Sequence, residues 1–495
     1  MTRISEASLP GCRQELRPIP YARTASPKVV HIGVGAFHRA HQAWYFDRLN
    51  EIAPEDPWLI LGASLRSRSS AEQLNPQDGL YCHIARSAGC SEARLIQSLI
   101  GVINAFEDPG SLVRAIGSPE TSLVTLTITE NGYCLTSDNR SLDLRDSNVR
   151  SDLACLEHPK TAIGFLVAGL WCRYEQEARK PLTILSCDNL PQNGVLTRDA
   201  VIAMAAHHSE SLALWIQEHV SFPSSMVDRI APAVTDSDRA EVKELLDLED
   251  HGLAITESFS QWVIEDCFAG ARPALEVVGA DFVNNVEAWE ERKLRLLNAA
   301  HTALACLAGR TGSTFVHEAI AETGLASFVN ALWADALDTL DYDESFDAAA
   351  YCSSLLERFA NPHLQHRLQQ IATDTSQKLP QRIIEPLGER LESGKDAIPM
   401  TTVVATWMQW AWGVDLSGTE LGFMDPMRET LREAVRGQDR NSRIAFDRIV
   451  QAYGPLASLG IRYPEWRDQQ LFPAFCEATL AYEAGVDGGA LISAW

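Results

Sequence analysis

Several patterns that mark particular protein classes are absent from this 495-residue sequence. No run of 18 or more apolar residues occurs, so no membrane-spanning helix is expected. Residues 1–20 lack the apolar core of a secretory signal peptide. The 11 cysteines include no Cys-x-x-Cys, which argues against both a zinc ribbon and a disulfide framework. These absences predict a soluble protein of the reducing cytoplasm.

Positive charge is also scarce. Lys and Arg together number 42 against 66 Asp and Glu, which gives a formal net charge of −24. Nucleic acids and anionic membranes are bound by clustered Lys and Arg, so neither is expected as the main partner. An anionic small molecule is not excluded, because it needs only a local positive site.

The character of the sequence changes near residue 285. Before this point, short β-branched runs at residues 29–32, 58–61, 122–129 and 182–185 alternate with helix-length segments. This alternation is typical of a largely parallel sheet covered on both faces. Beyond it, helix formers dominate residues 287–309, 348–372 and 428–452. We predict an α/β domain at residues 1–285 and a mostly α-helical domain at residues 286–495.

The first expected strand runs directly into Gly33-Val-Gly35, and a helix-forming segment follows. This order opens a Rossmann-like βαβ unit that binds a dinucleotide. The first glycine permits a tight turn, and the second lets the backbone approach a pyrophosphate at the helix N-terminus. The predicted cofactor-binding residues of this segment are Ile32, Gly33, Val34, Gly35, Ala36, Phe37, His38 and Arg39.

His38 and His41 lie three residues apart, which raises the alternative of a metal site. No carboxylate or cysteine is spaced locally to complete such a site, and His-Glu-x-x-His is absent. We therefore expect both histidines to pack within the cofactor loop, and no metal.

The end of the second strand usually carries an acid that binds the adenosine ribose of NAD. Here the chain has Ser64-Leu-Arg66-Ser-Arg68-Ser69 and no acid before Glu72. Arg66 is therefore a candidate cofactor residue, and the two arginines would tolerate the 2′-phosphate of NADP. Alternatively they are ordinary solvated charges, so we expect NAD and leave NADP open.

Hydride transfer at a secondary alcohol needs an acid or base beside the reacting oxygen and donors for the developing oxyanion. The sequence lacks both the Tyr-x-x-x-Lys of short-chain dehydrogenases and the cysteine cluster of zinc alcohol dehydrogenases. The best remaining group is Lys293, Asn298 and His301, which share one broad face of a regular α-helix. A solvated lysine and a hydrogen-bonded core histidine would account for the same residues.

Seven segments carry a family resemblance when taken in order. They are Gly33-Val-Gly-Ala-Phe-His-Arg-Ala-His41, Thr127-Ile-Thr-Glu-Asn-Gly-Tyr-Cys134, Ser186-Cys-Asp-Asn189, Met226-Val-Asp-Arg-Ile230, Trp262-Val-Ile-Glu-Asp266, the segment with Lys293, Asn298 and His301, and Ser376-Gln-Lys-Leu-Pro-Gln-Arg382. From about residue 29 to residue 430 the sequence resembles the long-chain mannitol dehydrogenase family. This family includes mannitol 2-dehydrogenases, arabinitol dehydrogenases and fructuronate reductases.

The resemblance implies a metal-free, nicotinamide-dependent oxidoreductase, monomeric, with a linear sugar acid or polyol bound in a cleft between two domains. It implies that Lys293 is the acid or base and that His301 orients the substrate. Asn189 and Asn298 would hydrogen-bond the reacting oxygen. Further substrate contacts are expected from Asp228, Lys378 and Arg382, with Glu130 near the site.

Within the family, Asn361-Pro-His-Leu-Gln-His-Arg367 resembles fructuronate reductases more than mannitol dehydrogenases. We therefore expect reduction of D-fructuronate to D-mannonate by NADH, with Lys378 and Arg382 binding the C1 carboxylate. The alternatives are a mannitol 2-dehydrogenase or another polyol dehydrogenase, a hydroxy-acid dehydrogenase and, outside the enzymes, a nicotinamide-binding sensor.

Overall fold

The structure is a computed structural model that divides into two compact units, Met1–Glu287 and Ala288–Trp495. It describes residues 2–9, 20–87, 91–136, 141–176, 179–309, 312–322, 324–342, 346–414, 418–422 and 424–483. The predicted domain boundary near residue 285 lies close to this division. Among the described residues, no helix is both long enough and apolar enough to cross a membrane.

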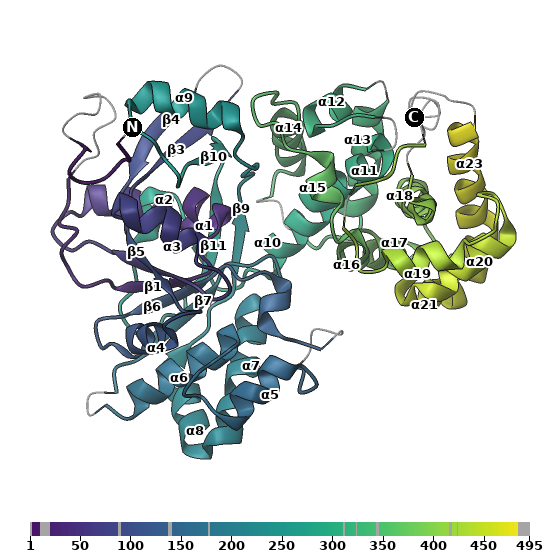
Figure 1. The fold of residues 1–495 in the computed structure, drawn as a ribbon. Coiled ribbons are helices and arrows are strands. Elements are labelled where there is room, and N and C mark those ends of the chain that lie inside the picture. Colours follow the sequence, from purple (N-terminus) through teal and green to yellow (C-terminus); the bar gives the residue numbers. More distant parts are fainter. Residues whose placement is uncertain are drawn as a thin grey trace. The chain divides into compact units, whose positions relative to one another are not determined.

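The first unit is built on a six-stranded parallel sheet with the strand order β5-β2-β1-β6-β7-β8 (Figure 1). The strands are β1 (Val29–Ile32), β2 (Ile60–Ser64), β5 (Leu99–Asn104), β6 (Leu123–Leu126), β7 (Leu182–Ser186) and β8 (Val220–Ser221). Every residue of β1, β6 and β7 is buried, as expected for parallel strands covered on both faces. The strand order reverses between β1 and β6. Their carboxyl ends therefore form the switch point at which open α/β sheets bind ligands.

Helices cover both faces of this sheet. Successive side chains of each strand point to opposite faces, so neighbouring residues of a strand enter different apolar cores. Val30 contributes to one apolar core, together with α4 (Pro109–Gly117), α6 (Ala162–Tyr174), α7 (Asn193–His208) and α8 (Glu210–His219). Val29 contributes to the other, together with α2 (Gln42–Ile52) and α3 (Ser69–Leu74). The prediction of an α/β, Rossmann-like first domain is thus confirmed.

Two three-stranded sheets of the first unit are absent from the prediction. One has the order β10-β3-β4 and contains β3 (Tyr81–Arg86), β4 (Ser91–Ile96) and β10 (Ala254–Glu257), with α9 (Asp236–Leu246) nearby in Figure 1. The other has the order β12-β11-β9 and contains β9 (Ser225–Asp228), β11 (Gln261–Glu265) and β12 (Asp281–Val283). β9 and β11 pair antiparallel, and Asp228 lies opposite Gln261.

The described part of the second unit is mostly helical, as predicted. Its central helix is α11 (Ala299–Ala308), in which all ten residues are buried. Around it lie α12 (Val316–Ala321), α13 (Leu325–Leu337), α15 (Leu368–Ala372) and α18 (Ile398–Met408). The remaining helices are α14 (Ala348–Phe359), α16 (Thr375–Leu379), α17 (Glu385–Glu392), α19 (Arg428–Ala434), α20 (Arg443–Ala452), α21 (Gly454–Arg462), α22 (Pro464–Trp466) and α23 (Phe472–Glu483).

Each of the three segments rich in helix formers contains more than one helix. Residues 348–372 form α14 and α15, and residues 428–452 form α19 and α20. Residues 287–309 stay helical but pass from α10 (Glu287–Arg292) through a π-helical stretch, η6 (Lys293–Asn298), into α11. The helical hydrogen bonding also changes at residues 375–392, where α16 passes through the π-helical η7 (Pro380–Ile384) into α17. Pro380 lacks a backbone N–H, which explains the altered hydrogen bonding there.

Candidate functional site

The turn after β1 is pressed against the end of β6, at the switch point of the sheet. Gly33 has φ +99°, and a Cβ atom added to it would lie 2.1 Å from the carbonyl oxygen of Thr127. The Thr127 hydroxyl also donates a hydrogen bond to the Gly33 carbonyl, at 2.8 Å. Both the backbone conformation and the lack of space therefore exclude a side chain at residue 33. A tight glycine turn after the first strand fits the close approach of a dinucleotide.

The predicted cofactor residues around this turn differ in exposure. Gly35 and Ala36 are exposed, Gly33, Phe37 and Arg39 are half-buried, and Ile32, Val34 and His38 are buried. The helix that follows is split at His41 into the short α1 (Ala36–Ala40) and α2.

Both histidines of the loop are fully buried in the first unit. The His38 ring stacks on His31 with ring centroids 3.4 Å apart, and burial holds the pKa of His38 well below its usual value. His41 Nε2 donates to the Gln261 carbonyl at 2.9 Å. Within the described ranges, no group of three or more His, Cys, Asp and Glu side chains is arranged to hold a metal ion. These contacts are those of packed loop histidines.

The two arginines after β2 lie in different surroundings. Arg68 forms ion pairs with Glu107 at 3.0 Å and Glu72 at 3.8 Å, so it behaves as a solvated loop charge. Arg66 is exposed in the same loop. It therefore stays the predicted cofactor residue of this segment.

Asp188 ties the ends of β6 and β7 together, a role that the sequence analysis missed. Its carboxylate accepts hydrogen bonds from the backbone N–H groups of Ile128 and Thr129, each at 2.9 Å, and from the Tyr133 hydroxyl at 2.7 Å. Thr129 has φ +64°, a strained conformation for a β-branched residue, and immediately precedes Glu130. Burial raises the pKa of Asp188 to about 6, even though its hydrogen bonds oppose the shift.

Asn193 fixes the next connection, between β7 and β9. Its Nδ2 donates to the carbonyls of Asp188 at 2.9 Å and Ser225 at 2.7 Å, and its Oδ1 accepts from the Ser225 N–H at 3.0 Å. The segments that carry Asn189 and Asp228 are therefore held together by a fully buried side chain. In the sequence, the only indication of these ties was a polar residue at the carboxyl end of a buried strand.

The three predicted site residues of the first unit lie on these tied segments. Glu130 and Asn189 are exposed, whereas Asp228, the last residue of β9, is 3% exposed. Arg229, beside Asp228, donates to the Ala40 carbonyl at 2.8 Å and stacks over Trp44. The hydrogen bonds of Asp188 and Asn193 thus bring together segments that are far apart in sequence.

In the second unit, Lys293 and Asn298 are the first and last residues of the π-helical stretch η6. The Ala299 N–H donates to the Leu294 carbonyl, five residues earlier, so side chains five apart lie about one turn apart. The regular α-helical geometry predicted here is therefore wrong. Single-turn π segments inside α-helices occur frequently at functional sites.

Two nitrogen atoms of this segment lack hydrogen-bond partners in the part of the chain that the structure describes. They are Asn298 Nδ2 and His301 Nε2, on side chains that are 7% and 6% exposed. Leaving such a group unpaired costs about 1–3 kcal/mol. Lys293, 8% exposed, belongs to the same buried set. The arrangement fits a polar ligand that would satisfy both nitrogen atoms.

The His301 ring packs against two other rings. Its centroid lies 4.6 Å from that of Phe359 and 5.2 Å from that of His366, which meets it edge-on. Arg382 Nη1 approaches the same segment, donating to the Thr302 hydroxyl at 3.1 Å and to the Asn298 carbonyl at 3.5 Å. Arg382 therefore lies beside the buried set.

The surroundings of His301 are positive. Burial holds the pKa of His301 well below its usual value, and it is lowered further by His366, Arg358, Arg382 and Lys293. His301 is therefore neutral at physiological pH and has one donor and one acceptor nitrogen. Lys378 is placed differently, because its ammonium donates to the carbonyls of Thr373 at 2.6 Å and Ile371 at 3.5 Å.

Two further charged residues beside the buried set, Glu290 and Arg295, were not predicted from the sequence. Glu290 lies one turn before Lys293 and is 7% exposed. Arg295, within η6, donates to both carboxylate oxygens of Glu389 at 2.6 and 2.8 Å and to the Thr339 carbonyl at 2.5 Å. The sequence offers several acids near Lys293 and does not indicate which of them is buried.

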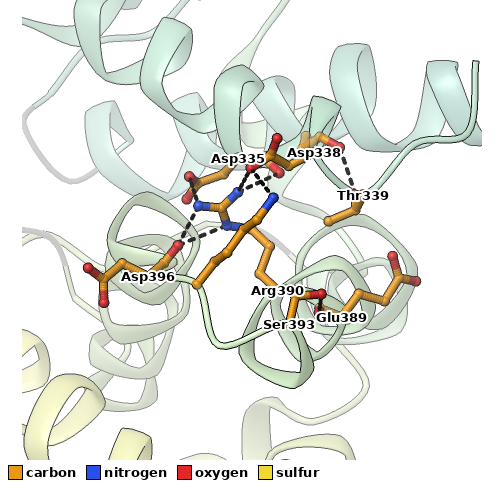
Figure 2. A network of polar contacts seen from close by, with 9 residues as sticks. Asp335, Asp338, Thr339, Glu389, Arg390, Ser393 and Asp396 are labelled. Atoms are coloured by element: carbon orange, nitrogen blue, oxygen red, sulfur yellow. Dashed lines mark hydrogen bonds and ion pairs between the residues drawn. The ribbon is translucent and has the colours of Figure 1, made fainter.

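The contacts of Arg295 with Glu389 and Thr339 form an ion-pair clamp on η6. Arg390, next to Glu389 on α17, adds further ion pairs to this clamp. Figure 2 shows the Arg390 guanidinium among Asp335, Asp338 and the carbonyl of Asp396. Its nitrogen atoms lie 2.9 Å from Asp335, 2.5 Å from Asp338 and 2.5 Å from the Asp396 carbonyl oxygen. Ion pairs on α17 and the end of α13 thus anchor η6.

Comparison with known proteins gives consistent matches over both units. The Mannitol dehydrogenase Rossmann domain matches residues 27–277, and the Mannitol dehydrogenase C-terminal domain matches residues 285–456. D-mannonate oxidoreductase of Escherichia coli is 37% identical over 448 residues, which cover 89% of this chain and 91% of the relative. Mannitol 2-dehydrogenase of Aspergillus fumigatus is 36% identical over 422 residues, 84% of each chain. The structure of Pseudomonas fluorescens mannitol 2-dehydrogenase with NAD and D-mannitol superposes with a TM-score of 0.84 at 32% identity, covering 96% of this chain and 99% of that one.

Proposed function

The chain belongs to the mannitol dehydrogenase family of oxidoreductases, and on this premise we propose that it uses NADH to reduce the ketone of a linear sugar acid. The best candidate reaction converts D-fructuronate to D-mannonate. The observation that carries the proposal is the buried set Lys293, Asn298 and His301, whose Asn298 Nδ2 and His301 Nε2 lack partners among the described residues.

Each member of the set has a distinct part in the proposed reaction. Bound NADH supplies the hydride, and the turn at Gly33 suits its pyrophosphate. Lys293 gives a proton to the ketone oxygen, and in the reverse direction its neutral amine accepts that proton. Asn298 and Asn189 donate hydrogen bonds to the oxyanion as it develops. Neutral His301 orients the substrate through its unpaired nitrogen.

The proposal assigns the remaining predicted residues to ligand binding. Ile32 to Arg39 and Arg66 would hold the cofactor, with Gly33, Gly35 and Ala36 giving the backbone its access. Asp228, Glu130, Lys378 and Arg382 would bind substrate hydroxyl or carboxylate groups. A cytoplasmic location and a monomeric state remain predictions.

Buried charge in the second unit favours an acid over a neutral polyol. Among the described buried side chains of this unit, Glu290 is the single Asp or Glu, against five Lys and Arg: Lys293, Arg295, Arg358, Arg382 and Arg390. Arg295 pairs with Glu389 and Arg390 pairs with Asp335. Lys293, Arg358 and Arg382 lower the pKa of His301. In a chain of net charge −24, this local positive site is what an anionic substrate requires.

A panel of linear keto sugars and keto sugar acids, each tested with NADH and NADPH, examines the proposal. We expect kcat/KM for D-fructuronate with NADH to exceed that for D-fructose by at least tenfold. Equal or faster reduction of fructose would favour a mannitol 2-dehydrogenase, the activity named for two of the similar proteins above. Tight cofactor binding without turnover of any sugar would instead indicate a nicotinamide sensor.

A further inference from the structure

His366 places a second unsatisfied histidine nitrogen beside His301. The two rings meet edge-on with their centroids 5.2 Å apart. The His366 side chain is half-buried, yet its Nδ1 is buried and has no hydrogen-bond partner among the described residues. The same holds for His301 Nε2 and for Nδ2 of Asn298, about one helical turn before His301. Three neighbouring side chains of the second unit thus each carry a buried, unsatisfied nitrogen atom.

The backbone on both sides of His366 fixes the position of its ring. The Val316 N–H donates to the His366 carbonyl at 2.9 Å, and the Leu368 N–H donates to the Thr314 carbonyl at 3.0 Å. The preceding residue, Gln365, has φ +44°, a left-handed conformation that is uncommon for a residue with a Cβ atom. Strained conformations of this kind cluster at sites that bind ligands. The fold therefore maintains a strained turn next to His366.

Both histidines are neutral at physiological pH. Burial lowers the pKa of His366 to about 4 and holds the pKa of His301 well below its usual value. A neutral imidazole has one donor and one acceptor nitrogen, and the tautomer decides which is which. A hydroxyl group both donates and accepts, so it matches either tautomer, whereas a carboxylate only accepts. The two histidines are therefore suited to hydroxyl groups, which neighbouring carbons of a linear sugar supply side by side.

We propose that His366 is a further substrate-binding residue, whose Nδ1 hydrogen-bonds a hydroxyl group of the linear sugar next to the group that His301 holds. This inference rests on the proposed function and extends it, because it adds a residue that recognises hydroxyl groups. It applies to a linear sugar acid and to a linear polyol alike, since both carry hydroxyl groups on neighbouring carbons.

The test compares three variants of His366 with the wild-type chain, using D-fructuronate and NADH. His366→Phe keeps a ring without nitrogen atoms, His366→Asn can place a polar atom near the position of Nδ1, and His366→Gln near that of Nε2. We expect His366→Phe to lower kcat/KM about tenfold, mainly through KM, as for the loss of one neutral hydrogen bond. His366→Asn should recover most of this loss, whereas His366→Gln should recover little.

Substrate analogues that each lack one hydroxyl group identify the partner of His366. A site that hydrogen-bonds a substrate hydroxyl rejects the analogue without it. In the wild-type enzyme, one analogue should lose about tenfold in kcat/KM, and in His366→Phe the same analogue should lose about twofold or less. If every analogue loses the same factor in both proteins, the inference is overturned.

His317→Phe is the matched control. His317, in α12 of the same unit, is also half-buried and also has a buried Nδ1 without a partner in the described part of the chain, but its ring stacks on Phe315. Its KM should stay normal. An equal rise of KM in His317→Phe, or a lower melting temperature with unchanged KM in His366→Phe, would overturn the inference.

Two further outcomes separate this inference from the function on which it rests. If His366→Phe does not fold, the comparison of His366→Asn with His366→Gln decides, and equal KM values in these two variants would overturn the inference. A wild-type preference for neutral ketoses would refute the proposed reduction of a sugar acid, and the same variants would then be compared on D-fructose.

Discussion

The two units hold their predicted site residues by different physical means. In the first unit, loops at the ends of strands are tied by hydrogen bonds that the Asp188 carboxylate accepts and the Asn193 amide donates. In the second, a π-helical stretch carries Lys293 and Asn298 and is anchored by ion pairs through Arg295 and Arg390. Hydrogen bonds to backbone groups fix where loops lie, whereas buried charge sets which ligands are favoured.

This difference predicts that substitutions in the second unit lower the catalytic rate most. Lys293→Met should lower kcat about 1,000-fold, because proton transfer by a positioned side chain contributes about 100- to 10,000-fold. Steady-state NADH oxidation measures the effect. Lys395→Met is the control, since Lys395 pairs with Asp338 at the surface and should keep normal turnover. Near-normal kcat in Lys293→Met would contradict the proposed mechanism.

The first unit should respond through geometry instead. Asp188→Asn places N–H donors against the N–H groups of Ile128 and Thr129, which releases the strained Thr129. We expect kcat/KM to fall about 10- to 100-fold, on the order of 1–3 kcal/mol for lost charged hydrogen bonds. Asp152→Asn, which also removes a carboxylate bonded to two backbone N–H groups, should change stability alone.

Asp188 also predicts a pH dependence. Because burial raises its pKa to about 6, wild-type activity should fall below about pH 6, where the carboxylate is protonated and its hydrogen bonds weaken. The unfolded chain ionises this group first, so its contribution to the free energy of unfolding decreases as pH rises from about 4 to about 6. A pH–rate profile for Asp188→Asn with the same acid limb would contradict this assignment.

The smallest expected effect on catalysis comes from the ion-pair clamp. Arg295→Met removes the contacts to Glu389 and Thr339 and should lower the free energy of unfolding by about 2 kcal/mol. kcat should fall only a few-fold, because Lys293 and Asn298 remain on η6. Urea unfolding and steady-state kinetics on the same preparation separate the two effects. A loss of kcat as large as that of Lys293→Met would contradict the distinction between Arg295, which anchors η6, and Lys293, which transfers the proton.

The sequence predicted what depends on local pattern. Buried β-branched runs located β1, β2, β6 and β7, and Gly33 was found because a positive φ at a tight turn leaves few alternatives to glycine. The short strands of the two smaller sheets pair across long sequence distances, as Asp228 does with Gln261, so no local period reveals them. Their existence depends on tertiary contacts.

The same limit applied to the candidate site. Lys293, Asn298 and His301 were identified by residue type, but the π-helical geometry that relates them depends on hydrogen bonds that no spacing rule supplies. The part played by Asp188 follows from a hydrogen-bond partner distant in sequence, Thr129. Residue type therefore indicated the proposed chemistry, whereas the residues that hold the site in place were identified only from the fold.

One competition assay tests the central claim most directly. The wild-type enzyme is given equal concentrations of D-fructuronate and D-fructose with limiting NADH, and the products are quantified. Their ratio equals the ratio of the two kcat/KM values, since both substrates compete for the same enzyme. The account predicts D-mannonate in at least tenfold excess over the hexitols. An excess of hexitol, or no consumption of NADH with either substrate, would contradict it.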